Sequence, residues 1–127
     1  MQPSDTKTVL LADDEQFIAI AYKDGLERAG YKVVVAHDGE EAEQLALELK
    51  PDLVLLDLIM PKVNGFEVLK ALKSNPEFAS VPIMILSNLG QPADEAEARS
   101  YGAADFIVKA DISLKDLLLR IEQVLGR

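Results

Sequence analysis

The chain has 127 residues, 49% of them hydrophobic, which suits one compact domain with a buried core and leaves little room for a second. Its formal net charge of -9 argues against a broad basic face that binds nucleic acid and favours a cation or a basic protein surface as partner. The sequence has no cysteine and one histidine, His37, which excludes disulfides, thiol catalysis and multi-histidine zinc sites.

The N-terminal stretch "MQPSDTK" predicts a flexible tail over residues 1–6 ahead of one domain that fills the rest of 1–127. It has neither the basic nor the apolar segment of a secretion signal, and no apolar run approaches the ~18 residues that a membrane span needs. We therefore expect a soluble, cytoplasmic protein that makes no contact with a membrane.

Short runs rich in leucine, isoleucine and valine recur along the chain and predict five β-strands, at residues 8–12, 31–36, 51–57, 81–87 and 105–109. Each run is continuously apolar instead of alternating with polar residues. This pattern is typical of a parallel sheet that is covered by helices on both faces.

The stretches between these strands carry the signals of helix ends. Capping-box spacing predicts helix starts at Asp38 with Glu41, Asn64 with Glu67, and Ser113 with Asp116. Gly30 and Gly102 should end helices that begin near Glu15 and Pro92, while Pro51 and Pro76 should close two others. Strand and helix therefore alternate five times, which predicts an α/β three-layer sandwich.

Polar residues follow four of the predicted strands, and in an α/β sheet this edge is where ligands bind. They are Asp13, Asp14, Asp57, Ser87 and Lys109. Three carboxylates in one pocket repel each other unless they share a cation, and Mg²⁺ suits such oxygen ligands. Lys109 would supply a positive charge for an anion and Ser87 a hydroxyl donor.

Taken singly, most of these residues have a simpler interpretation. Asp14 could cap the first helix, with Asp13 as a surface acid. Lys109 could be a solvated strand end, and Ser87 an ordinary loop residue or helix cap. Phe106 would be a core residue, and Asp57 is the one for which the sequence offers no obvious structural partner.

In combination, these residues resemble the receiver domains of two-component response regulators over nearly the whole chain. The resemblance rests on "LVLLDLIMPKVNGFEVL", in which Pro61 and Gly65 stand four and eight residues after Asp57. It implies a flavodoxin-like sheet of strand order 2-1-3-4-5 with five helices. It also implies that Asp57 accepts a phosphoryl group from a phosphohistidine on a sensor histidine kinase or phosphotransfer protein.

The same resemblance assigns the remaining site residues. Asp14 would bind Mg²⁺ directly and Asp13 largely through water, together with Asp57 and the backbone carbonyl of Ile59. Ser87 would move onto the phosphoryl group, Lys109 would pair with it, and Phe106 would change rotamer. Two positions depart from the family pattern: Ala110 stands where proline with a cis peptide is common, and Asn88 where a small residue is usual.

Helical spacing in the first helix places a set of residues toward the core: Ile18, Tyr22, Gly25 and Ala29. Phe17 and Ile20 are left toward the active-site side or solvent and suggest a docking patch for the kinase, as the resemblance also implies. The alternative is that the apolar stripe of this helix is simply wide.

We therefore expect a signalling switch, not an enzyme, that takes part in its own phosphorylation and autodephosphorylation. Its output would pass through the fourth helix, fifth strand and fifth helix to a protein target, or through a phosphorylation-linked homodimer. An unphosphorylated adaptor remains as an alternative. A flavin or nucleotide enzyme is a weaker one, because the acidic "ADDEQ" would repel phosphate. The sequence leaves open whether the receiver stands alone or was taken from a longer protein.

Overall fold

The computed structural model of the chain describes residues 6–126, so most of the tail predicted over residues 1–6 lies outside the described residues. Its strands are β1 (Thr8–Ala12), β2 (Lys32–Ala36), β3 (Leu53–Leu56), β4 (Ile83–Ser87) and β5 (Asp105–Val108). Its α-helices are α1 (Gln16–Arg28), α2 (Gly39–Leu49), α3 (Gly65–Lys73), α4 (Pro92–Ser100) and α5 (Leu114–Leu125). Short 3-10 turns lie at Pro76–Phe78 and Lys109–Asp111.

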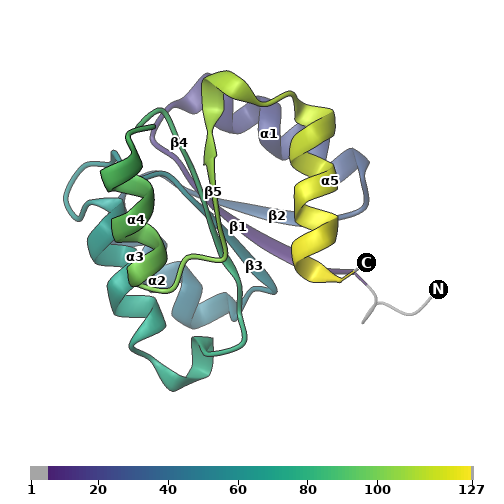
Figure 1. Cartoon of the computed structure of the whole chain (residues 1–127). Coiled ribbons are helices and arrows are strands. Elements are labelled where there is room, and N and C mark those ends of the chain that lie inside the picture. Colours follow the sequence, from purple (N-terminus) through teal and green to yellow (C-terminus); the bar gives the residue numbers. More distant parts are fainter. Residues whose placement is uncertain (1–5, 127) are drawn as a thin grey trace.

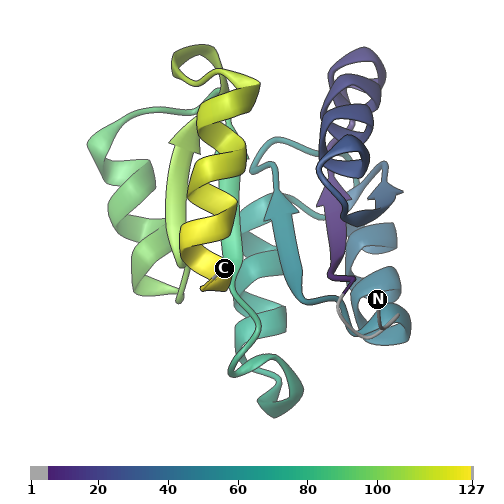
Figure 2. The same cartoon turned by 90° about the vertical axis from the view of Figure 1, so that its right-hand side faces the viewer.

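The strands form one parallel sheet of order β2-β1-β3-β4-β5, as predicted (Figure 1). Helices α1 and α5 cover one face, and α2, α3 and α4 cover the other (Figures 1 and 2). Each face has its own core, because successive strand residues point to opposite sides. Leu10 of β1 packs toward α2 and α3, whereas Val9 and Leu11 pack toward α1 and α5.

The helix ends follow the sequence signals. Asp38, Asn64 and Ser113 each accept a hydrogen bond from the backbone N–H three residues further on, which satisfies a donor that the helix start leaves free. Gly30 and Gly102 follow α1 and α4 with φ angles of 101° and 103°, a conformation that glycine adopts at little cost.

The predicted core face of α1 is only partly correct. Gly25 is buried, Ile18 and Tyr22 are half-buried, and Ala29 is exposed because the helix has already ended at Arg28. The residues that pack most deeply are instead Ala19 and Leu26, at 2% and 0% exposed. The sheet therefore meets a face of α1 that is rotated slightly from the predicted one.

Candidate functional site

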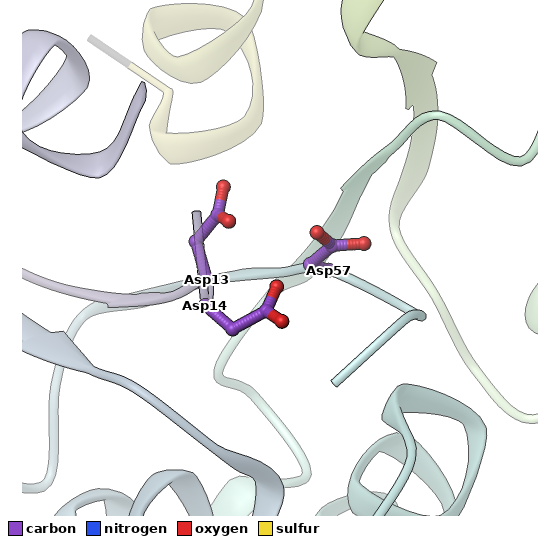
Figure 3. Close-up of side chains that lie close together, drawn as sticks. All are labelled: Asp13, Asp14 and Asp57. Atoms are coloured by element: carbon purple, nitrogen blue, oxygen red, sulfur yellow. The ribbon is translucent and has the colours of Figure 1, made fainter. Parts of the chain in front are cut away.

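The carboxyl ends of β1 and β3 place the acidic residues at one edge of the sheet. The backbone N–H of Asp13 donates to Ala36 O at 3.0 Å, and that of Asp57 donates to Ala12 O at 2.9 Å, so sheet bonding continues through both residues. Oxygen atoms of Asp13, Asp14 and Asp57 all lie within 4.8 Å of one another (Figure 3). The predicted cluster of three carboxylates is thus brought together.

The two neighbouring aspartates have different environments. Asp13 is 1% exposed, so its interpretation as a surface acid is wrong, whereas Asp14 is exposed. The interpretation of Asp14 as the helix cap is also wrong, because Glu15 occupies the N-cap position of α1. Asp13 Oδ1 instead accepts the Glu15 N–H at 2.9 Å, so the buried carboxylate is tied to the start of the helix.

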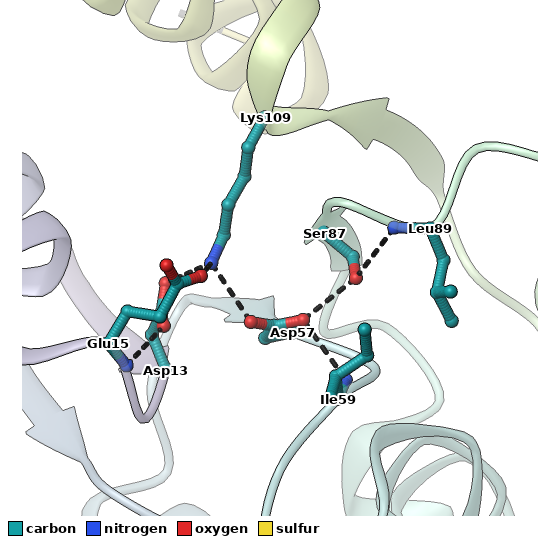
Figure 4. A network of polar contacts seen from close by, with 7 residues as sticks. All are labelled: Asp13, Glu15, Asp57, Ile59, Ser87, Leu89 and Lys109. Carbon is teal, nitrogen blue, oxygen red and sulfur yellow. Dashed lines mark hydrogen bonds and ion pairs between the residues drawn. The ribbon is translucent and has the colours of Figure 1, made fainter.

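Asp57 is 3% exposed, and both of its carboxylate oxygens accept hydrogen bonds (Figure 4). Oδ1 accepts from Ser87 Oγ at 2.8 Å and from the Ile59 N–H at 3.0 Å. Oδ2 accepts from Lys109 Nζ at 2.9 Å. A buried carboxylate is therefore reached from the carboxyl ends of two further strands, by the Ser87 hydroxyl of β4 at one oxygen and by the Lys109 ammonium group just after β5 at the other.

Lys109 is 7% exposed, which rules out the interpretation of a solvated strand end. Its Nζ lies 2.9 Å from Asp57 Oδ2, 2.7 Å from Asp13 Oδ2 and 2.8 Å from Glu15 Oε1. Burial alone would lower the pKa of Lys109, but these three carboxylates outweigh it and raise the pKa. Glu15 is the contact that the sequence analysis did not anticipate.

Burial raises the pKa of Asp13, and the neighbouring Lys109 offsets only part of that effect. The two upward pKa shifts therefore differ in their main cause: burial for Asp13, and the neighbouring carboxylates for Lys109. Three carboxylates nevertheless surround one ammonium group. Extra positive charge should therefore stabilise the pocket.

The turn after Asp57 explains the "MPKVNG" motif physically. An added Cβ at Gly65 would lie 2.2 Å from Asp57 O and 2.4 Å from Leu58 Cα, so only glycine fits there without moving the backbone. The Gly65 N–H donates to Leu58 O at 2.9 Å, and Asn64 caps α3. The close approach of α3 thus fixes the backbone of Asp57.

The acidic cluster fits a hard divalent cation. Asp13 Oδ2 is buried and has no aligned hydrogen-bond donor among residues 6–126, although Lys109 Nζ lies close enough for an ion pair. Asp14 is exposed beside it, and the donors are all carboxylate oxygens. Carboxylate oxygens together with water are the ligands that Mg²⁺ takes in proteins.

The remaining predicted residues differ in their exposure. Phe106 is 9% exposed on β5, and Ile59 is 53% exposed beside Asp57. Asn88, after Ser87, is exposed. None of the peptide bonds that the structure describes is cis, so the Lys109–Ala110 bond is trans, and Ala110 lies in the 3-10 turn Lys109–Asp111.

The apolar residues proposed for docking are exposed on α1. Phe17 is 89% exposed and Ile20 is 63% exposed, as predicted. A cavity of about 190 Å³ lies beside Ile20 and is lined also by Ala19 and Val35.

Comparison with known proteins identifies the family of the chain and supports its fold. The family model of the response regulator receiver domain matches residues 9–122. The chain belongs to the response regulator receiver family. The predicted resemblance is thereby confirmed, and the rival prediction of a flavin or nucleotide enzyme receives no support.

Individual receivers and regulators are similar over almost all of the chain. The DNA-binding dual master transcriptional regulator RpaA of Synechocystis is 37% identical over 94% of this chain and 49% of its own length. The transcriptional regulatory protein CpxR of Escherichia coli is 38% identical over the same shares. The structure of the chemotaxis protein CheY4 of Vibrio cholerae covers 94% of this chain and 98% of that one, with a TM-score of 0.87 and 31% identity.

The chain spans about half the length of the curated relatives that it matches. It is the receiver domain of a two-component response regulator, a signalling domain and not a conventional enzyme. Within residues 6–126, every helix is too short or too polar to cross a bilayer.

Proposed function

We propose that Asp57 accepts one phosphoryl group from a phosphohistidine of a sensor kinase or phosphotransfer protein, and that Mg²⁺ is bound in the acidic cluster during the reaction. The observation that carries this proposal is the buried Asp57 carboxylate held between Ser87 and Lys109. A carboxylate in a fixed position can act as a nucleophile, and phosphoryl transfer otherwise needs mainly positioning and neutralised charge.

In the proposed step an Asp57 oxygen forms a bond to phosphorus while the phosphorus–nitrogen bond of the donor breaks, and the donor imidazole keeps the electron pair. Among the described residues Oδ2 accepts one hydrogen bond and Oδ1 two, so Oδ2 has the freer lone pair for attack. Lys109 and Ser87 then donate to phosphoryl oxygens. The cation, held by Asp13, Asp14, Asp57 and the Ile59 carbonyl, would supply charge neutralisation.

Incubation with acetyl phosphate followed by intact-mass measurement tests this function. The wild-type chain should gain the mass of one phosphoryl group with millimolar Mg²⁺ and none with EDTA. A chain that gains no mass under either condition would contradict the proposal and favour an adaptor that works unphosphorylated.

The metal assignment predicts an effect of Asp14→Asn on stability. The substitution removes one charge from the cluster, while Asp14 makes no hydrogen bond or ion pair within the described part of the chain. Relief of repulsion, screened because Asp14 is exposed, should stabilise the variant by on the order of 1 kcal/mol in EDTA. Bound Mg²⁺ stabilises the folded state by mass action, so wild type should gain more from Mg²⁺ than the variant.

Melting curves of wild type and Asp14→Asn, each with EDTA and with Mg²⁺, measure both the stability in EDTA and the response to Mg²⁺. If the variant melts lower than wild type in EDTA and responds equally to Mg²⁺, the acidic residues hold no metal.

Phosphorylation is proposed to act on partner binding through α4, β5 and α5, with Ser87 and Phe106 moving together, and with Phe17 and Ile20 as a docking patch for the kinase. A two-state switch responds only if the phosphoryl group binds one state better. Amide exchange over residues 92–117 should therefore change when beryllofluoride, a phosphoryl mimic, binds.

Alanine at both Phe17 and Ile20 should slow phosphoryl transfer from the cognate kinase but not from acetyl phosphate. Equal rates of transfer from the kinase to the variant and to wild type would refute the docking patch.

A further inference from the structure

Three carboxylates compete for the ammonium group of Lys109 (Figure 4). An ammonium group has three N–H donors. Lys109 Nζ donates hydrogen bonds to Glu15 Oε1 and Asp57 Oδ2, and it lies 2.7 Å from Asp13 Oδ2 as an ion-pair partner. Once Asp57 Oδ2 is bonded to phosphorus, the phosphoryl oxygens carry the negative charge and compete with Glu15 and Asp13 for Lys109.

The three partners differ in what their release would cost. The side chains of Asp13 and Asp57 are 1% and 4% exposed, whereas the Glu15 side chain is 42% exposed. A buried carboxylate that loses its cation is left poorly solvated, whereas an exposed one is hydrated at once. Glu15 is thus the partner that can leave most easily.

The Glu15 carboxylate has no structural task at the helix start. Glu15 is the N-cap residue of α1, yet within residues 6–126 its side chain makes no capping hydrogen bond. Its backbone N–H is satisfied by Asp13 Oδ1 at 2.9 Å. The side chain instead reaches Lys109, which is 94 residues away in the sequence.

We infer that Glu15 is the exchangeable partner of Lys109: it holds the ammonium group in the unphosphorylated receiver and yields it to the phosphoryl group on Asp57. This inference rests on the proposed phosphorylation of Asp57. Glu15 is then a positioning residue that favours the unphosphorylated state, because its contact with Lys109 competes with the contact that stabilises the phosphorylated one.

Binding of beryllofluoride in saturating Mg²⁺ measures this competition without group transfer. Glu15→Gln keeps the size of the side chain and an acceptor oxygen but removes the charge. It should tighten beryllofluoride binding about three- to fivefold, the range expected for loss of one partly exposed ion pair. Phosphoryl gain from acetyl phosphate should be faster by a similar factor.

Glu27→Gln is the matched control. Glu27 lies on the same helix, is paired with Lys23 at 3.6 Å, and does not contact Lys109. This variant loses the same charge and should bind beryllofluoride like wild type.

Glu15→Asp separates the contact from the charge. The shorter carboxylate keeps its charge but should fall short of Lys109, because an aspartate at an N-cap turns toward the helix N–H groups. It should behave like Glu15→Gln.

Three outcomes would overturn the inference: Glu15→Gln binding like wild type, Glu15→Gln binding more weakly, or Glu15→Asp binding like wild type while Glu15→Gln binds more tightly. The last outcome would mean that Glu15 acts through the electrostatic field of its charge and not through its contact with Lys109. Failure of the proposed function looks different, because wild type itself would then take up neither phosphoryl nor beryllofluoride.

Discussion

Asp57→Asn should abolish the gain of phosphoryl mass from acetyl phosphate and Mg²⁺. An amide oxygen is a poor nucleophile toward phosphorus, and among residues 6–126 no other carboxylate is held by both Ser87 and Lys109. The asparagine oxygen can still accept hydrogen bonds from Ser87 and the Ile59 N–H, so the variant should remain folded. Intact mass after incubation gives the result directly.

Asp52→Asn is a suitable control, because Asp52 lies just before β3, at the opposite end of the strand from Asp57. Its Oδ2 accepts the Thr8 N–H at 2.8 Å, so it too is a hydrogen-bonded aspartate. This variant should gain mass like wild type. Labelling of Asp57→Asn at the wild-type level would mean that the phosphoryl group resides elsewhere.

The set of site residues at one edge of the sheet could be predicted from the sequence, because the pattern of apolar residues shows where each strand ends. Apolar runs end at Ala12, Leu56 and Leu86, and the next polar residues must then emerge at the same edge of a parallel sheet. The glycine at position 65 could also be singled out from the sequence. The structure explains why it is needed, because its close approach to the Asp57 backbone leaves no room for a side chain.

The roles of Asp13 and Asp14 could not be separated from the sequence, since both are acids after the same strand. Sheet bonding continues through Asp13, so its side chain keeps the inward direction of that strand position and becomes buried. Asp14 is the next residue and faces the other way, into solvent.

Two ion pairs had no local signal at all. Glu15 meets Lys109 from the other end of the chain, and a third acid after Asp13 and Asp14 gives no indication of that contact. Asp105 at the start of β5 is 8% exposed and accepts from Arg120 Nε of α5 at 2.8 Å. Such pairs depend on how helices are placed against strands, which the pattern of apolar residues determines only coarsely, as the rotated core face of α1 also shows.

The other large effect is expected for Lys109→Met. Methionine preserves the apolar stem of the side chain but removes the only ammonium group that contacts Asp13, Glu15 and Asp57 among the described residues. Loss of one partner from a buried ion pair costs about 3 to 5 kcal/mol, because the remaining charge is left uncompensated. For a domain of this size, the melting temperature in EDTA should fall by roughly 10 °C or more.

Lys115→Met is the matched control, because Lys115 is exposed on α5 and the chemical change is the same. Its stability should stay within about 0.5 kcal/mol of wild type. If Lys109→Met melts together with Lys115→Met, the buried contacts of Lys109 contribute nothing to folding.

The pH dependence of Lys109→Met distinguishes uncompensated charge from a mere packing defect. The pKa of Lys109 is raised in the folded protein, so its contribution to stability is complete at all pH values below its unfolded pKa of about 10.4. Burial raises the pKa of Asp13, so a folded chain binds a proton there more tightly than an unfolded one, and acid favours folding at this group. Without Lys109 this effect should grow, because only the hydrogen bond from the Glu15 N–H then offsets it. The difference in melting temperature between wild type and Lys109→Met should therefore narrow as the pH is lowered from neutral toward 4. Mg²⁺ at neutral pH should narrow this difference as well, because both treatments reduce the excess negative charge of the pocket. A packing defect would leave the difference unchanged by either treatment.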